Sequence, residues 1–211
     1  MMSAMHTTPR QTPPPCPTGA DVTGVILAGG KSRRMGRDKA TLVLDGTTLF
    51  EGTRAMLSGL FSQMLIAGDR PDLASDAVPC FPDIFPGSAL GGIHNGLFHA
   101  KTPWIFIAPC DLPFPDARLV MALLNRRANA DCVVIRTPEG LEPVFALYHQ
   151  NCRPVMERML TAGHLRITDF FPQVNTSYLD SRSLPDNWQR ALYNLNAPDD
   201  LRGLAATGDL S

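Results

Sequence analysis

The chain lacks a long hydrophobic run. None of its apolar stretches approaches the ~20 residues that a membrane-spanning helix needs. Residues 1–20 also lack the apolar segment that a signal peptide carries. We therefore expect a cytoplasmic protein that does not bind membranes.

Cysteine and histidine are few, and neither follows a metal-binding pattern. The five cysteines are odd in number and contain no C-x-x-C pair, and the five histidines show no metal-ligand spacing. This pattern argues against a disulfide framework and against a zinc site, and it favours reduced thiols in the cytoplasm. Cys110 has no base close to it in the sequence, so we expect a buried, inert thiol.

The chain also lacks an excess of charge of either sign. Charged residues make up 18% of the 211 residues and the formal net charge is −1, so no overall basic field would attract nucleic acid. Hydrophobic residues make up 44%, which is ordinary for a soluble globular protein. We interpret residues 1–21, rich in proline, as a disordered tail and residues 22–211 as one domain. A start-site choice that lengthens the chain is the alternative explanation of the tail.

Positive charge is instead concentrated in one stretch, Val25–Ala40, which reads VILAGGKSRRMGRDKA. Four apolar residues suit a buried strand, and the Gly29-Gly30 pair breaks it before five cationic residues. Glycines let backbone N–H groups approach an anion, and cations neutralise phosphate charge. The stretch fits neither of two common phosphate loops, because a Walker A loop would need glycine where Val25 stands and the G-x-G-x-x-G spacing is missing.

A single carboxylate, Asp111, follows the strongly apolar segment 104–108. At the carboxyl end of a core strand it would share an edge of the sheet with the glycine loop, where it could hold Mg²⁺ against nucleotide phosphates. The alternative is a cap for the helix expected at 115–127. We favour the metal site because the glycine loop is present.

Strand-like and helix-like segments alternate along the chain and predict an α/β domain with a mostly parallel sheet flanked by helices. Thr48 is the expected cap of the first helix, and Pro115 the expected first residue of the third. The expected strands are 22–28, 63–67, 78–81, 104–108, 132–136 and 144–148, and the expected helices are 48–60, 90–100, 115–127, 151–162 and 199–205.

The segment LAGGKSRRMGRDKA resembles the signature L-A-G-G-x-S-x-R-M-G-x-D-K of the molybdenum cofactor guanylyltransferases, which have a single Rossmann-like nucleotidyltransferase domain. Cys110-Asp111-Leu112-Pro113 is similar to their C-D-x-P segment, whose aspartate binds magnesium. The resemblance implies Mg²⁺ as cofactor, held by Asp111. The nucleotide-binding residues that it implies are Leu27, Ala28, Gly29, Gly30, Lys39, Asp83 and Asp111.

Three further segments extend the resemblance. Asp83 precedes a glycine-rich helix start and by resemblance contacts the nucleoside, although it could instead stabilise a turn. Glu142-Pro143 opens a segment similar to one expected near the pterin substrate, or else an edge strand. Asn194 and Asn196 resemble an N-x-N pair that could bind the second substrate or cap the last helix. Arg166 belongs to a short segment resembling one that meets the same substrate.

The resemblance implies transfer of GMP from GTP to molybdenum-molybdopterin, with molybdopterin guanine dinucleotide cofactor and pyrophosphate as products. Lys39 and Arg34 would stabilise the transition state, while Asp111 holds Mg²⁺. A phosphate acceptor is already largely ionised near neutral pH, so no general base is required. Transient contact with other molybdenum cofactor proteins is also implied.

Two alternatives remain. A related nucleotidyltransferase could use CTP on molybdopterin or act on a sugar phosphate, but the second glycine of the Gly29-Gly30 pair leaves room for the larger purine. A non-catalytic nucleotide-binding protein would need the glycine loop but not Asp111.

Overall fold

The computed structural model describes residues 19–29 and 38–193. Several predictions from the sequence fall outside these residues: the proline-rich tail, Gly30, Arg34, Asn194, Asn196 and the helix at 199–205.

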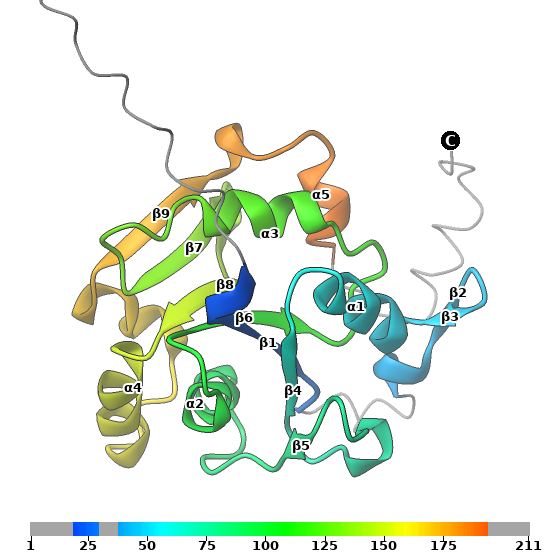
Figure 1. The fold of residues 1–211 in the computed structure, drawn as a ribbon. Helices are drawn as coiled ribbons and strands as arrows, with labels where there is room; N and C mark the ends of the chain where they lie inside the picture. The colour runs from blue at the N-terminus through cyan, green and yellow to red at the C-terminus, as the bar shows by residue number, and fades with distance from the viewer. Residues whose placement is uncertain (1–18, 30–37, 194–211) are drawn as a thin grey trace, which may run out of the picture.

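A seven-stranded sheet forms the centre of the molecule (Figure 1). Strands β5, β4, β1 and β6 are parallel, β8 runs antiparallel to both of its neighbours, and β9 is parallel to β7. The mostly parallel sheet predicted from the sequence is therefore confirmed. In sheet order the strands are β5 (Cys80–Phe81), β4 (Gln63–Ala67), β1 (Val22–Leu27), β6 (Trp104–Pro109), β8 (Gly140–His149), β7 (Cys132–Thr137) and β9 (Thr176–Asp180).

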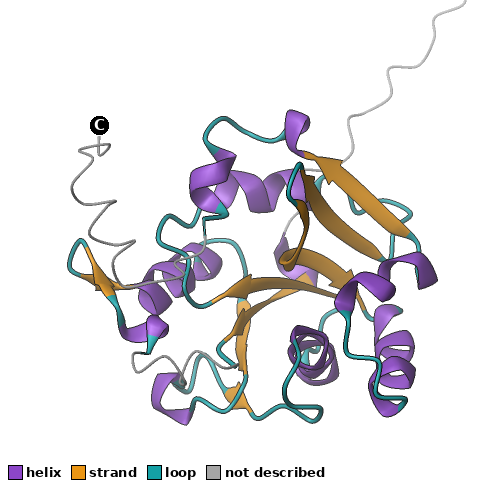
Figure 2. Cartoon of the chain, turned by 180° about the vertical axis from the view of Figure 1, so that it is seen from behind, coloured by secondary structure: helices purple, strands orange, loops and turns teal. Residues whose placement is uncertain are grey.

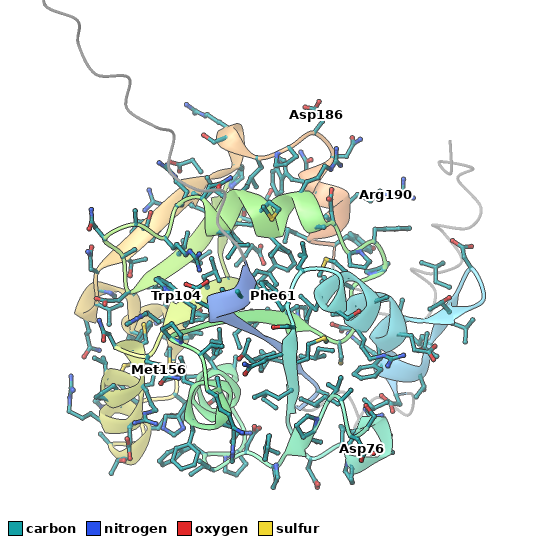
Figure 3. The ribbon with its side chains drawn as sticks, viewed as in Figure 1. Phe61, Asp76, Trp104, Met156, Asp186 and Arg190 are labelled. Atoms are coloured by element: carbon teal, nitrogen blue, oxygen red, sulfur yellow. The ribbon has the colours of Figure 1, made fainter. Side chains whose placement is uncertain are left out.

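Helices cover both faces of the sheet, as the views from the two sides show (Figures 1 and 2). One face packs against α1 (Leu49–Ser58), α3 (Ala117–Leu124) and the end of α5 (Trp188–Ala191). The other packs against α2 (Ala89–His99) and α4 (Cys152–Thr161), whose buried Met156 is labelled in Figure 3. Alternate strand residues supply the two cores, because successive side chains of a strand point to opposite faces.

Shorter elements connect these layers. A hairpin of β2 (Val43–Leu44) and β3 (Thr47–Thr48) turns at Asp45-Gly46, where both residues have positive φ, as a tight hairpin turn requires. None of the helices in the described part of the chain is long and apolar enough to cross a membrane. The single-turn 3-10 helices among the described residues are η1 (Gly19–Asp21), η3 (Lys39–Thr41), η4 (Pro71–Leu73), η5 (Ile167–Asp169), η6 (Phe171–Gln173) and η7 (Ser181–Ser183).

Most of the predicted elements have bounds within a few residues of those observed, with the following main differences. Asp116 caps α3 by accepting a hydrogen bond from the Arg118 amide, so Pro115 precedes the helix rather than opening it. Strand β8 begins at Gly140, four residues before the predicted segment. Strand β9 and the short helix α5 were not predicted at all.

Glycines of α2 bring this helix close to the central strands. A Cβ atom at Gly96 would lie 3.0 Å from Val25 Cγ1 and 3.2 Å from Ile105 Cδ1. Phe61 and Trp104, labelled in Figure 3, precede β4 and open β6 at the amino-terminal edge of the sheet. The carboxyl-terminal edge lies at the other ends of these strands.

Candidate functional site

Four parallel strands end side by side, and each is followed within two residues by a glycine or an aspartate. Strand β1 leads into Ala28-Gly29 and β4 into Gly68, whereas β5 and β6 lead to Asp83 and Asp111. Strand β1 lies in the middle, with β4 on one side and β6 on the other. Ligands of open α/β sheets bind where the strand order reverses in this way.

Backbone contacts hold these strand ends together. The Ala28 amide donates to Ala67 O at 3.0 Å, and the Cys110 amide donates to Leu27 O at 3.2 Å. Gly68 has φ +136°, and a Cβ atom there would lie 2.7 Å from the amide nitrogen of Gly29. Both observations require glycine at position 68. The loop after β1 thus starts from a fixed position.

The structure brings Lys39 and Asp111 together from distant parts of the sequence. Lys39 opens η3, Asp111 follows β6, and Lys39 Nζ lies 3.7 Å from Asp111 Oδ2. The two side chains are 21% and 17% exposed. Both groups therefore remain accessible to a ligand at this edge.

The charge state of Asp111 depends on two opposing influences. Burial raises the pKa of the Asp111 carboxyl, and the ammonium of Lys39 lowers it. The neighbouring Cys110 differs, because burial and the charge of Asp111 raise its pKa to about 12. The thiol is therefore protonated at neutral pH, in agreement with the inert cysteine predicted from the sequence.

Asp83 lies against the glycine loop. Asn95 Nδ2, on α2, donates to Asp83 Oδ1 at 3.3 Å and to Phe81 O at 2.8 Å. A Cβ atom at Gly29 would lie 3.2 Å from Asp83 Oδ2. Burial raises the pKa of Asp83, and the hydrogen bond from Asn95 opposes that shift. Asp83 and Gly29, predicted to bind the nucleotide together, are thus adjacent.

A second charged cluster adjoins this edge, and sequence reasoning did not identify it. Arg70, after β4, is 7% exposed and contacts two carboxylates. Its Nη2 lies 2.6 Å from Asp38 Oδ2 and 2.7 Å from Asp72 Oδ2. Asp38 is part of the glycine-loop signature, but no local signal pairs it with an arginine 32 residues away.

Two residues predicted near the second substrate, Arg166 and Glu142, lie within the described part of the chain. Arg166 is exposed at the start of η5, beyond α4. Glu142 is partly exposed in β8, where burial and the nearby Glu139 raise its pKa.

The carboxylate of Asp111 is an oxygen donor of the kind that binds hard divalent cations such as Mg²⁺. In the described part of the chain, no group of three or more His, Cys, Asp or Glu residues could hold a metal ion. Mg²⁺ is commonly bound through one or two carboxylates together with substrate phosphates, and it keeps several waters. A partly accessible carboxylate at the glycine-lined ends of these strands fits that mode.

Solved structures share this fold. The crystal structure of molybdopterin-guanine dinucleotide biosynthesis protein A from Archaeoglobus fulgidus superposes with a TM-score of 0.73 at 23% identity, covering 86% of this chain and 95% of that one. A 4-diphosphocytidyl-2C-methyl-D-erythritol synthase from Anaerococcus prevotii reaches 0.67 at 11% identity, covering 90% and 96%. At these identities the similarity establishes the fold alone.

Sequence comparison identifies the family. The chain is 34% identical over 187 residues to a probable molybdenum cofactor guanylyltransferase from Carboxydothermus hydrogenoformans, covering 87% of this chain and 95% of the relative. It is 33% identical over 192 residues to the molybdenum cofactor guanylyltransferase of Vibrio cholerae, covering 89% and 93%. Residues 24–174 match the MobA-like NTP transferase domain, and the matched segment includes most of β1 and all of β4, β5 and β6, with the residues that follow them. The chain therefore belongs to the MobA-like NTP transferase family.

Proposed function

We propose that this protein transfers GMP from GTP to molybdenum-molybdopterin, forming the molybdopterin guanine dinucleotide cofactor and pyrophosphate. The single observation that carries the proposal is the Lys39–Asp111 pair at the glycine-lined edge of the sheet. The names of relatives that are 31–36% identical to this chain add the substrates.

The reaction requires stabilisation of charge more than proton transfer. An oxygen of the acceptor phosphate attacks the α-phosphorus of GTP, and the bond from that phosphorus to the bridging oxygen of the β-phosphate breaks. Negative charge builds on the α-phosphoryl oxygens and on the departing pyrophosphate. In this proposal the ammonium of Lys39, which lies 3.7 Å from Asp111, stabilises this charge, and Arg34 supplies a second cation from the loop. The acceptor is already ionised, so no residue needs to act as general base.

Asp111 would hold Mg²⁺, which when bound neutralises phosphate charge. The carboxylate also orients Lys39 through their contact of 3.7 Å. The ammonium of Lys39 suits the phosphates of a nucleotide, and the adjacent carboxylate of Asp111 suits the divalent ion that accompanies them.

The nucleoside and the phosphates of GTP would bind to different residues. We assign the phosphates to the loop that begins at Leu27, Ala28 and Gly29, and the nucleoside to Asp83, which lies beside Gly29. Asn194, Asn196 and Arg166 remain our candidates for the second substrate, and cytoplasm is the proposed location. Nucleic acid and membranes are not expected partners, whereas transient contact with other molybdenum cofactor proteins is.

Ligand-induced thermal stabilisation tests the nucleotide half of this proposal. A ligand that binds only the folded state raises the melting temperature. We expect a rise with GTP, enlarged by Mg²⁺, and little change with CTP, ATP or UTP. In Asp111→Asn the additional rise from Mg²⁺ should be lost. A shift with CTP alone, or equal shifts with every nucleotide, would contradict the proposal.

A further inference from the structure

Arg70 is a buried cation that no step of the proposed reaction uses. It is 7% exposed, and its guanidinium is shared between two carboxylates. Nη1 and Nη2 face Asp38, at 3.0 Å from Oδ1 and 2.6 Å from Oδ2. Nε and Nη2 face Asp72, at 2.9 Å from Oδ1 and 2.7 Å from Oδ2. An arginine can form paired bonds along two edges in this way, and a lysine cannot.

Asp38, which Arg70 holds, also caps the turn that begins at Lys39. Its Oδ1 accepts a hydrogen bond from the Ala40 amide at 3.2 Å, so the side chain that Arg70 holds also caps η3. The Asp38 carbonyl accepts from the Thr41 amide and hydroxyl, at 3.2 and 2.9 Å. Lys39 is the first residue of this turn. The hydrogen bonds from Ala40 and Thr41 to Asp38 therefore close the turn around Lys39 and restrain its backbone.

The cluster lies at the same strand ends as the proposed reaction centre. Arg70 follows β4, and the Lys39–Asp111 contact is formed at the end of β6. Three segments from different parts of the sequence therefore meet through Asp38 and Lys39.

We propose that Arg70 is a positioning residue, which orients Asp38 and thereby places the Lys39 ammonium beside Asp111. This inference rests on the proposed function, in which Lys39 stabilises the charge on the transferring phosphoryl group. It adds that the alignment of Lys39 depends on a residue beyond the glycine loop.

The kinetic test uses two variants. Arg70→Lys keeps the positive charge but removes the planar guanidinium that bonds both carboxylates. Asp38→Asn removes the charge of the carboxylate that Arg70 contacts and leaves Arg70 unchanged. Misplacing a catalytic group by about 1 Å can cost about 10²-fold in rate. We expect kcat for GMP transfer to fall about that much in both variants, with a smaller change in the KM for GTP. Such a split indicates loss of an interaction made in the transition state.

Arg127→Lys is the matched control. Arg127 is also a partly buried arginine on an aspartate, with Nη1 2.8 Å from Asp21 Oδ1, but it lies next to η1 at the start of β1, at the opposite edge of the sheet. The same substitution there should leave kcat unchanged. If Arg70→Lys retains the kcat of the parent, or if Arg127→Lys loses as much, the proposal is overturned.

A second measurement does not depend on turnover. Lys31, Lys39 and Lys101 are the three lysines of the chain, so lysine labelled with ¹³C at Cε gives few NMR signals. The Lys39 signal is identified by its loss in Lys39→Arg. We expect Asp111→Asn to shift this signal in the parent and not in the Asp38→Asn background. An equal shift in both backgrounds refutes the positioning role, even if the parent proves to use no GTP. Failure of the proposed function would instead remove the parent's turnover and leave this NMR difference intact.

Discussion

The two residues at the centre of the site, Lys39 and Asp111, carry opposite charges and are partly accessible to solvent. Lys39 and Asp111 are each about one-fifth exposed, whereas Cys110 is held as a neutral thiol. Local motifs in the sequence predicted Lys39, Asp111 and Asp83. Arg70 could not be predicted, because its role depends on a contact with Asp38 that only the folded chain creates.

Substitution of Asp111 should affect the rate of GMP transfer much more than substitution of the adjacent Cys110. Asp111→Asn keeps the shape of the side chain and removes its charge, so we expect transfer to fall by about 10²-fold or more. Cys110→Ser should keep most of the activity, because a thiol with a pKa of about 12 has no ionised form to contribute at neutral pH. Steady-state rates of both purified variants check this. A larger loss in Cys110→Ser than in Asp111→Asn would contradict the assignment.

Asp83 should lower the stability of the protein at neutral pH. Burial raises its pKa above that of the unfolded chain, so its contribution to stability is present below the unfolded-state pKa and lost as the pH rises through the folded-state value. Asp83→Asn should therefore melt at a higher temperature than the parent at pH 7, with the difference closing below about pH 4. The same variant should gain less stability from GTP.

Melting curves across this pH range, with and without nucleotide, provide the measurement. If Asp83→Asn melts below the parent at pH 7, burial of the charge is not the dominant effect. An undiminished response to GTP would remove Asp83 from the nucleoside site.

At the scale of elements, local sequence signals predicted most of the fold. Thr48 caps α1 in a capping box with Glu51, and β4 has the predicted bounds. The failures have physical causes. Strand β9 reads TSYLD and carries too few apolar residues to stand out, and β8 starts in the polar segment before Pro143. Both depend on pairing with β7, which no local pattern encodes.

Helix α2 should be sensitive to a single methyl group at its start. A Cβ atom at Gly91 would overlap the carbonyl oxygen of Phe85, in the loop that carries Asp83. The clash should outweigh the gain in helix propensity, so Gly91→Ala is expected to destabilise the protein by about 1–3 kcal/mol and to weaken stabilisation by GTP. Gly52→Ala in α1 is the control, since the nearest atom to its Cβ would be Pro115 Cγ at 3.9 Å.

The control should gain about 1 kcal/mol in the free energy of unfolding, because alanine is the better helix former. Denaturant unfolding of the two variants measures both changes. Equal effects of the same sign would show that the contact with Phe85 does not restrain α2.

At the scale of the whole molecule, the strand order creates the site. The alternation of strands and helices predicted an α/β fold, but not the order in which strands pair. That order places β1 between β4 and β6 and so gathers Gly29, Gly68 and Asp111 at one edge. The candidate site is therefore a property of the assembled sheet, to which each motif contributes one part.

Transfer of label from GTP tests the central proposal most directly. The protein is incubated with molybdenum-molybdopterin, Mg²⁺ and GTP that carries ³²P at either the α or the γ position. Label from the α position should appear in the pterin product and label from the γ position in pyrophosphate, and neither transfer should occur with Lys39→Met. Label from the γ position in the pterin, or release of labelled pyrophosphate without any labelled pterin, would contradict a guanylyl transfer.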